Sequence, residues 1–104
     1  MKDHYPLFAE FKKEHPDIFE RNEALGEYIH QHGGPLDEKT RWLIKVGIAA
    51  AHHREHALGT HIAKAREAGA TEEEILHALY LVIPTCGFPH FMEAYRVYKG
   101  REGD

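Results

Sequence analysis

Residues 51–70 read Ala-His-His-Arg-Glu-His-Ala-Leu-Gly-Thr-His-Ile-Ala-Lys-Ala-Arg-Glu-Ala-Gly-Ala. This alanine-rich stretch predicts a helix that ends at Gly69, because glycine readily adopts the left-handed conformation that terminates helices. The stretch places Arg54, Glu55, His56 and His61 within two helical turns. We therefore expect the upstream chain to be a scaffold that leads into this segment, and residues 80–95 to form the wall that faces it.

Apolar residues recur at helical spacing on both sides of this segment. They predict helices over residues 5–14, 17–32, 38–51, 72–83 and 89–98. No stretch alternates between polar and apolar residues with a period of two, so we expect no sheet. Residues 1–104 are then a single all-α domain of about six helices. The pattern leaves open whether one helix runs from 38 to 68 or a break falls near residues 51–53.

Three polar residues are expected to cap helices, because their side chains can accept hydrogen bonds from the first backbone N–H groups. Two of them precede a glutamate at the spacing of a capping box. The three are Asp17 (with Glu20), Asp37, and Thr71 (with Glu74). The stretch Gly33-Gly34-Pro35 is expected to end the helix before Asp37.

Proline and glycine residues predict a helix end, a loop and a close approach between helices. Pro84 is expected to stop the helix that begins near residue 72, because it lacks a backbone N–H. Residues 85–89, Thr-Cys-Gly-Phe-Pro, are then expected to form a loop. Gly47 lies in the middle of an apolar helix, where it predicts a close approach between helices.

The composition narrows the class of protein. Thirteen basic and seventeen acidic residues give a net charge of −4, which excludes the basic face of a nucleic-acid binder and a polybasic membrane patch. No apolar run reaches the roughly 18–20 residues that a membrane span needs. The first residues, Met1 to Tyr5, lack the apolar core of a signal peptide, so a cytoplasmic location is expected.

His61 and Arg54 form the strongest candidate site for acid/base chemistry. They are seven residues apart, so an unbroken helix brings them to one face. His61 can transfer a proton near neutral pH. Arg54 can bind a carboxylate or an oxyanion. Glu55 is expected to orient His56 or to pair with Arg54 of a neighbouring subunit; the alternative is a surface salt-bridge network of little energetic value.

The histidines also allow a metal site. His52 and His56 are four residues apart and could donate two ligands to a divalent ion such as Zn²⁺ or Ni²⁺, with a third from His90 or from a second subunit. The His-Glu-x-x-His pattern of zinc proteases is missing, because His53 follows His52. The alternative is a solvated polar face without a metal or any other cofactor.

Cys86 is the single cysteine, so the chain cannot form an intrachain disulfide or a cysteine-type structural zinc site. Its thiol could be reactive if a helix N-terminus or a histidine lowers its pKa. A buried packing role is the alternative.

Four stretches together resemble a known family. They are Leu36-Asp37-Glu38-Lys39-Thr40-Arg41-Trp42-Leu43-Ile44, Arg54-Glu55-His56-Ala57-Leu58-Gly59-Thr60-His61, Glu67-Ala68-Gly69-Ala70-Thr71-Glu72-Glu73-Glu74-Ile75, and Cys86-Gly87-Phe88-Pro89. Their order resembles the carboxymuconolactone decarboxylase family, which includes the alkylhydroperoxidase D-like proteins. The resemblance covers roughly residues 25–98. It implies an alkylhydroperoxidase D-like helical fold and obligate homo-oligomers, commonly homotrimers or homohexamers.

The resemblance implies different activities in different branches of the family. The alkylhydroperoxidase branch has a Cys-x-x-Cys pair seven and four residues before the histidine and a glutamate further upstream. Those positions here are Arg54, Ala57 and Trp42, so dithiol peroxidase chemistry is not expected. The decarboxylase branch implies loss of CO₂ from a lactone carboxylate, with His61 as the acid/base and Arg54 holding the carboxylate. Ala57 stands where that branch often has glutamate.

Three hypotheses result. The first is a lyase-type enzyme that acts on a small carboxylate or lactone and uses His61 and Arg54. Its further candidate catalytic residues are Glu55, His56, His90 and Cys86. The second is a metal-binding or non-catalytic member of the family, with His52 and His56 as ligands. The third, by family resemblance alone, is peroxiredoxin-like redox chemistry with the single thiol of Cys86.

Overall fold

The computed structural model describes residues 5–101, and within that range it contains helices and no strand. This confirms the all-α prediction. The helices are α1 (Tyr5–Glu14), α2 (Pro16–His32), α3 (Glu38–Ala51), α4 (Glu55–Glu67), α5 (Glu72–Tyr80), α6 (Val82–Cys86) and α7 (Phe88–Lys99). Contacts divide the chain into an N-terminal unit, residues 1–36, and a C-terminal unit, residues 37–104. Whether the two fold as one domain stays a prediction.

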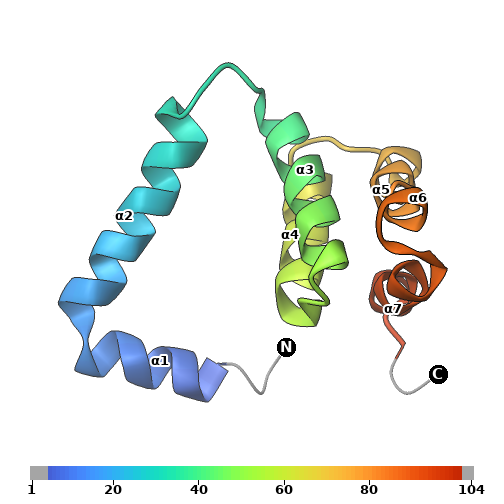
Figure 1. Ribbon diagram of the computed structural model, residues 1–104. Coiled ribbons are helices and arrows are strands. Elements are labelled where there is room, and N and C mark those ends of the chain that lie inside the picture. Colours follow the sequence, from blue (N-terminus) through green and yellow to red (C-terminus); the bar gives the residue numbers. More distant parts are fainter. Residues whose placement is uncertain (1–4, 102–104) are drawn as a thin grey trace. The chain divides into compact units, whose positions relative to one another are not determined.

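The N-terminal unit consists of α1 and α2 (Figure 1). Phe8 of α1 packs edge-to-face on Phe19 of α2, with ring centroids 5.1 Å apart. None of the side chains of α2 is fully buried. Leu25 and Ile29 stay 57% and 55% exposed, so this unit leaves apolar surface uncovered.

The start of α2 differs from the prediction, and its end does not. The helix begins at Pro16, and its N-cap, His15, makes no side-chain capping hydrogen bond. The predicted capping box at Asp17 is therefore wrong, because Asp17 already lies inside the first turn. Proline fits there, since the first N–H groups of a helix need no partner within the helix. The helix ends at His32, directly before Gly33, as predicted.

Helix α3 is the centre of the C-terminal unit, and it packs against α4, α5, α6 and α7 (Figure 1). Buried apolar side chains from all five helices and the α4–α5 connection form the core. They are Val46, Ala49, Ala50, Leu58, Ile62, Ala65, Ala70, Ile75, Leu79, Val82, Phe91 and Ala94. Burying such side chains contributes about 1.5–3 kcal/mol for each large one, so this core holds the helices in a fixed arrangement.

The other two predicted caps are present. The Asp37 side chain accepts a hydrogen bond from the backbone N–H of Thr40 at 2.8 Å, at the start of α3. Thr71 and Glu74 form a complete capping box at the start of α5, with distances of 3.0 and 2.9 Å. At the end of α4, Gly69 has φ +95°, which confirms the left-handed terminator.

The histidine segment does not continue α3, because the helix breaks between Ala51 and Glu55. The alternative of one helix from 38 to 68 is therefore wrong. His53 sits in the break with φ +56°, a left-handed conformation that most residues with a Cβ avoid. Its ring contacts His90 of α7, with centroids 4.1 Å apart. The break lets α4 turn back and pack along α3.

Two predictions about proline and glycine are wrong. Pro84 does not stop α5, which ends at Tyr80; Pro84 is the third residue of the short helix α6. A proline is tolerated there, because the first helical N–H groups have no partner in the helix. Residues 85–89 are not a loop either, since only Gly87, with φ +105°, separates α6 from α7.

Gly47 does not mark a close contact between helices. A Cβ built on Gly47 would meet no atom within 4 Å. The predicted close approach is therefore wrong for the described part of the chain. Among residues 5–101, no helix is long and apolar enough to cross a membrane.

Candidate functional site

Arg54 and His61 line one cavity of about 330 Å³ in the C-terminal unit. Its remaining lining comes from α3, from the residue that caps α3 and from the first turn of α4. These residues are Lys45, Ile48, Ala49, His52 and Ala57. The cavity thus holds two of the side chains that the sequence singled out for acid/base chemistry, and α3 supplies the facing wall.

Local backbone contacts place the two residues. Arg54 is the N-cap of α4, and its N–H donates to the Ala49 carbonyl at 3.0 Å, which ties the start of α4 to the last turn of α3. The Arg54 carbonyl accepts from the N–H of Leu58 at 2.7 Å. Leu58 and Ile62 are buried and hold α4 on α3, which fixes the direction in which His61 points.

An indole ring and an ammonium group lie near His61. The Trp42 ring of α3 is 5.5 Å from the His61 ring, centroid to centroid. The Lys45 ammonium lies 4.4 Å from the centre of the same Trp42 ring. Trp42 occupies the position at which the family resemblance places a glutamate. An indole therefore contacts the histidine where a proton-relaying carboxylate is expected in the alkylhydroperoxidase branch.

The charge of the cavity favours an anion. Lys45 and Arg54 line it, and no carboxylate is among its lining residues. Burial lowers the pKa of Lys45, because a partly desolvated ammonium is less stable than one in water. A bound carboxylate would offset this cost by pairing with the ammonium. The Nδ1 atom of His61 is buried as well.

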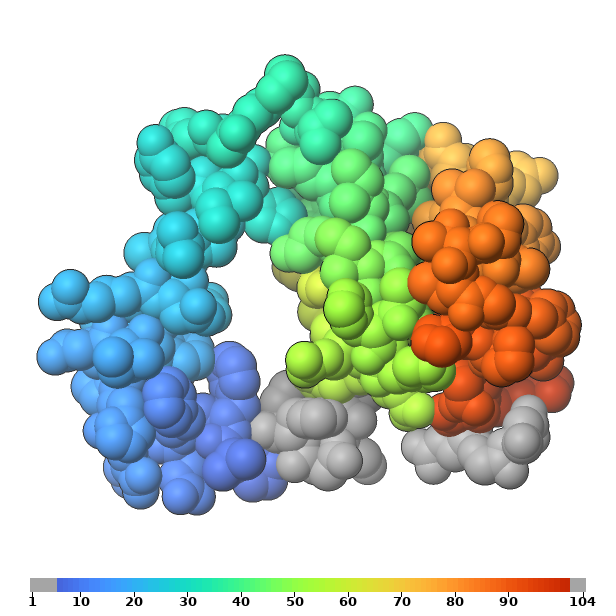
Figure 2. Space-filling view, viewed as in Figure 1, coloured from blue at the N-terminus to red at the C-terminus, as the bar shows by residue number. Residues whose placement is uncertain are grey.

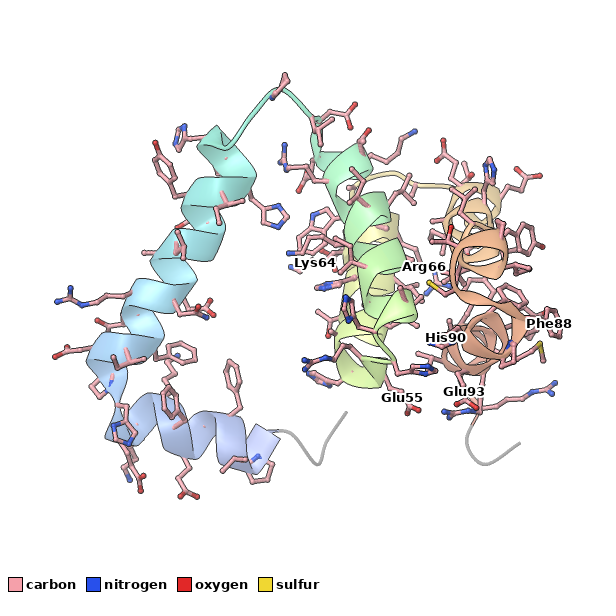
Figure 3. The ribbon with its side chains drawn as sticks, in the orientation of Figure 1. Glu55, Lys64, Arg66, Phe88, His90 and Glu93 are labelled. Carbon is pink, nitrogen blue, oxygen red and sulfur yellow. The ribbon has the colours of Figure 1, made fainter. Side chains whose placement is uncertain are left out.

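Glu55 belongs to a different cluster. It pairs with Arg96 of α7, and Arg96 also bonds Glu93 at 3.0 Å. Figure 3 shows Glu55 and Glu93 at the same end of the unit. Glu55 does not line the cavity of Arg54 and His61. Its proposed role, to orient His56 or to pair with Arg54 of a neighbour, stays a prediction.

The remaining candidates also lie outside this cavity. His56 is half-buried in the first turn of α4, and its carbonyl accepts from the Thr60 hydroxyl at 3.2 Å. His90 packs against His53. Cys86 is half-buried and lines a second cavity. The catalytic roles of His56, His90 and Cys86 stay predictions.

The geometry assumed for the metal site is not present. His52 caps the end of α3 and His56 lies in α4, so the two do not share a helix face at four-residue spacing. Within the described residues, no group of three or more His, Cys, Asp or Glu side chains is arranged to hold one metal ion. His52 instead lines the cavity of Arg54 and His61.

The second cavity is a larger, mostly apolar groove of about 570 Å³. It runs between α3 on one side and α5 and α6 on the other, and Figure 2 shows these green and orange surfaces side by side. Ile48 and His52 line both this groove and the cavity of Arg54 and His61. The two hollows therefore adjoin along one turn of α3.

The sequence did not point to Lys45 or Trp42 as site residues. Both come from α3, and their position depends on how α3 is rotated against α4. One signal was available, because Trp42 and Lys45 are three residues apart and so share a helix face. The helical spacing could not show that this face turns toward His61.

The comparisons with known proteins identify the family. The model of the carboxymuconolactone decarboxylase family matches residues 16–100. The chain therefore belongs to the carboxymuconolactone decarboxylase family, as the sequence motifs predicted. A crystal structure of an apo protein of this family from Legionella pneumophila superposes with a TM-score of 0.83. That protein is 30% identical, and the match covers 97% of this chain and 89% of that one.

Two uncharacterized proteins of Methanocaldococcus jannaschii are also similar. One is 34% identical over 89 residues, which cover 85% of each chain. The other is 31% identical over 93 residues, which cover 89% of this chain and 86% of that one. The similarity thus extends over most of each relative's length.

Proposed function

We propose that the cavity of Arg54 and His61 is the active site of a lyase that acts on a small carboxylate or lactone. The observation that carries the proposal is the lining of this cavity. It combines two cationic side chains, Lys45 and Arg54, with a histidine, and its lining includes no acidic residue. Such a site attracts an anionic substrate and offers a proton donor next to it.

The proposed reaction uses these residues in separate roles. Arg54 and Lys45 hold the substrate carboxylate and the oxygen on which negative charge develops. The carbon–carbon bond to the carboxylate breaks, CO₂ leaves, and the electron pair stays on the organic fragment as an enolate. His61 then donates a proton to the carbon that lost CO₂, and water returns the proton to His61. The step requires no oxidant or reductant.

To test the proposal, the protein is incubated with a panel of lactone carboxylates, and a coupled assay measures the release of CO₂. We expect His61→Ala to lower kcat by about 10²–10⁴-fold, the usual contribution of general acid–base catalysis. Arg54→Gln and Lys45→Met should raise KM, because each removes a cation that binds the substrate, and should also lower kcat, because each removes a charge that stabilises the developing enolate. Circular dichroism of each variant shows whether the fold is retained.

Lys64→Met is the matched control. Lys64 is on the same helix as His61, is exposed, and forms a loose ion pair with Glu67 at 3.8 Å. The kcat and KM of this variant should equal those of the wild-type protein. If His61→Ala retains full activity on every substrate that the wild type accepts, the proposal is wrong.

A further inference from the structure

We propose that the groove between α3, α5 and α6 binds the apolar tail of the substrate whose carboxylate is held by Arg54 and Lys45. The ligand class is then an amphipathic carboxylate, with an anionic head and an extended hydrocarbon body. This inference rests on the proposed function, because it uses the same cationic cavity as the site of the head group.

The first observation is that the groove and the cavity adjoin at Ile48 and His52. Ile48 and His52 line both hollows, so a ligand seated in the cationic cavity can extend over Ile48 into the groove. Groove-lining residues continue along α3 from Ile48 back to Thr40. At 1.5 Å per residue, this is about 12 Å of helix, within which an extended alkyl chain fits.

The second observation is the character of the walls. Ile44, Ile48 and Leu81 line the groove and are 45%, 55% and 57% exposed. Leu43 and Val82 complete an apolar floor. Ligand sites typically occupy 300–1,000 Å³ and combine apolar walls with a few polar groups, and the groove of about 570 Å³ meets both criteria.

The third observation concerns Gly47, which lines the groove from the middle of α3. A glycine inside a helix costs about 1 kcal/mol relative to alanine. Within the unit, nothing lies within 4 Å of the position that a Cβ of Gly47 would take. Packing inside the unit therefore does not require a glycine there. A larger side chain at this position would instead fill the groove.

The charges favour a carboxylate head at one end only. At the Thr40 end, the groove lining includes the carboxylate of Glu74, which pairs with Lys39 at 3.0 Å and would repel an anionic head group. At the Ile48 end, the groove meets the cavity with Lys45 and Arg54. A chain with an anionic head thus has one favourable orientation, with its tail pointing toward Thr40.

A homologous series of straight-chain carboxylates tests the inference. The dissociation constants of acetate, butanoate, hexanoate, octanoate and decanoate are measured by calorimetry on the full chain. Because each buried methylene contributes about 0.8 kcal/mol, affinity should rise by up to about fourfold per methylene. Decylamine, which has the same tail and a cationic head, should bind at least tenfold more weakly than decanoate.

Gly47→Leu provides the decisive variant, and Gly26→Leu provides its control. Both glycines lie inside helices with no atom within 4 Å of an added Cβ, but Gly26 is in α2 and does not line the groove. Gly47→Leu should weaken decanoate binding at least tenfold and leave acetate binding within twofold. Gly26→Leu should leave the affinities of both carboxylates unchanged.

The outcomes separate this inference from the proposed function. If acetate and decanoate bind equally well, or if Gly47→Leu weakens both equally, the groove does not hold the tail and the inference is wrong. If Gly47→Leu changes the oligomeric state and not decanoate affinity, a second copy covers the groove, which also overturns the inference. If carboxylates bind and Arg54→Gln has no effect on any of them, the proposed site itself is wrong.

Discussion

Glu72 joins three helices through one carboxylate. Arg66, at the end of α4, donates to it from Nε at 2.8 Å and from Nη2 at 2.9 Å. The Tyr98 hydroxyl of α7 donates to the same carboxylate at 2.8 Å. The hydrogen bonds from Arg66 and then Tyr98 lower the pKa of Glu72 to about 2. The ionised form of this residue is therefore favoured in the folded state.

This pKa shift predicts how Glu72→Gln changes the pH dependence of stability. A carboxylate with a lowered pKa stabilises the fold above its unfolded pKa of 4.5, and the stabilisation is lost as the pH falls toward 2. Urea denaturation between pH 2 and pH 7 should show the wild type more stable above pH 4.5, with the difference vanishing near pH 2. Because the pair is exposed, the difference should stay below about 1 kcal/mol.

Glu73→Gln is the neutral control, since Glu73 is an exposed neighbour in the same helical turn. A stability difference between Glu72→Gln and wild type that stays constant across the whole pH range would show that the ion pair is not its source.

Of the four residues discussed at the candidate site, the sequence pointed to Arg54 and His61 but not to Lys45 and Trp42. Arg54 and His61 could be paired from their spacing, because both lie on α4 or at its cap. Lys45 and Trp42 could not be placed beside them. Their position depends on side-chain packing between α3 and α4, which includes buried contacts of Val46, Leu58 and Ile62. Helical periodicity gives the face of each helix but not the rotation of one helix against the next.

Most helix ends were predictable from residues next to them in the sequence. The cap at Asp37, the capping box at Thr71 and the terminator Gly69 were all predictable, because each acts through hydrogen bonds or dihedral angles of neighbouring residues. The break at His53 was one of two alternatives, since a left-handed histidine has no sequence signal. The prediction that Pro84 ends α5 was wrong because a proline can either follow the end of one helix or lie in the first turn of the next.

The capping box gives a prediction for stability. Thr71→Ala removes the acceptor for the Glu74 N–H and should lower the free energy of unfolding by about 1 kcal/mol. Thr60→Ala is the matched control, because the Thr60 hydroxyl bonds a carbonyl inside α4 and caps no helix. Thermal and urea denaturation measure both variants. Equal losses in the two variants would show that the cap contributes nothing of its own.

Helix α2 carries an apolar face that the N-terminal unit does not cover by itself. Ile18, Leu25 and Ile29 follow one face of α2, and each is more than half exposed. Large apolar patches of this kind usually mark interfaces between proteins. We propose that α2 mediates association of this chain into a homotrimer or homohexamer, the assemblies that the family resemblance implies.

Sedimentation velocity tests this proposal with a pair of variants on one helix. Ile29→Glu places a charge on the apolar face and should dissociate the assembly into smaller species, because a buried unpaired charge is costly. Gln31→Glu adds the same charge at an exposed position of α2, and it should sediment as the wild type does. A wild-type chain that sediments as a monomer would contradict the proposal.

The contact between Trp42 and His61 has an optical consequence. Trp42 is the only tryptophan of the chain, so all indole emission comes from a ring 5.5 Å from His61 and 4.4 Å from the Lys45 ammonium. An imidazolium quenches indole emission more strongly than a neutral imidazole does. We therefore expect the intrinsic fluorescence of the unlabelled protein to fall when His61 gains a proton.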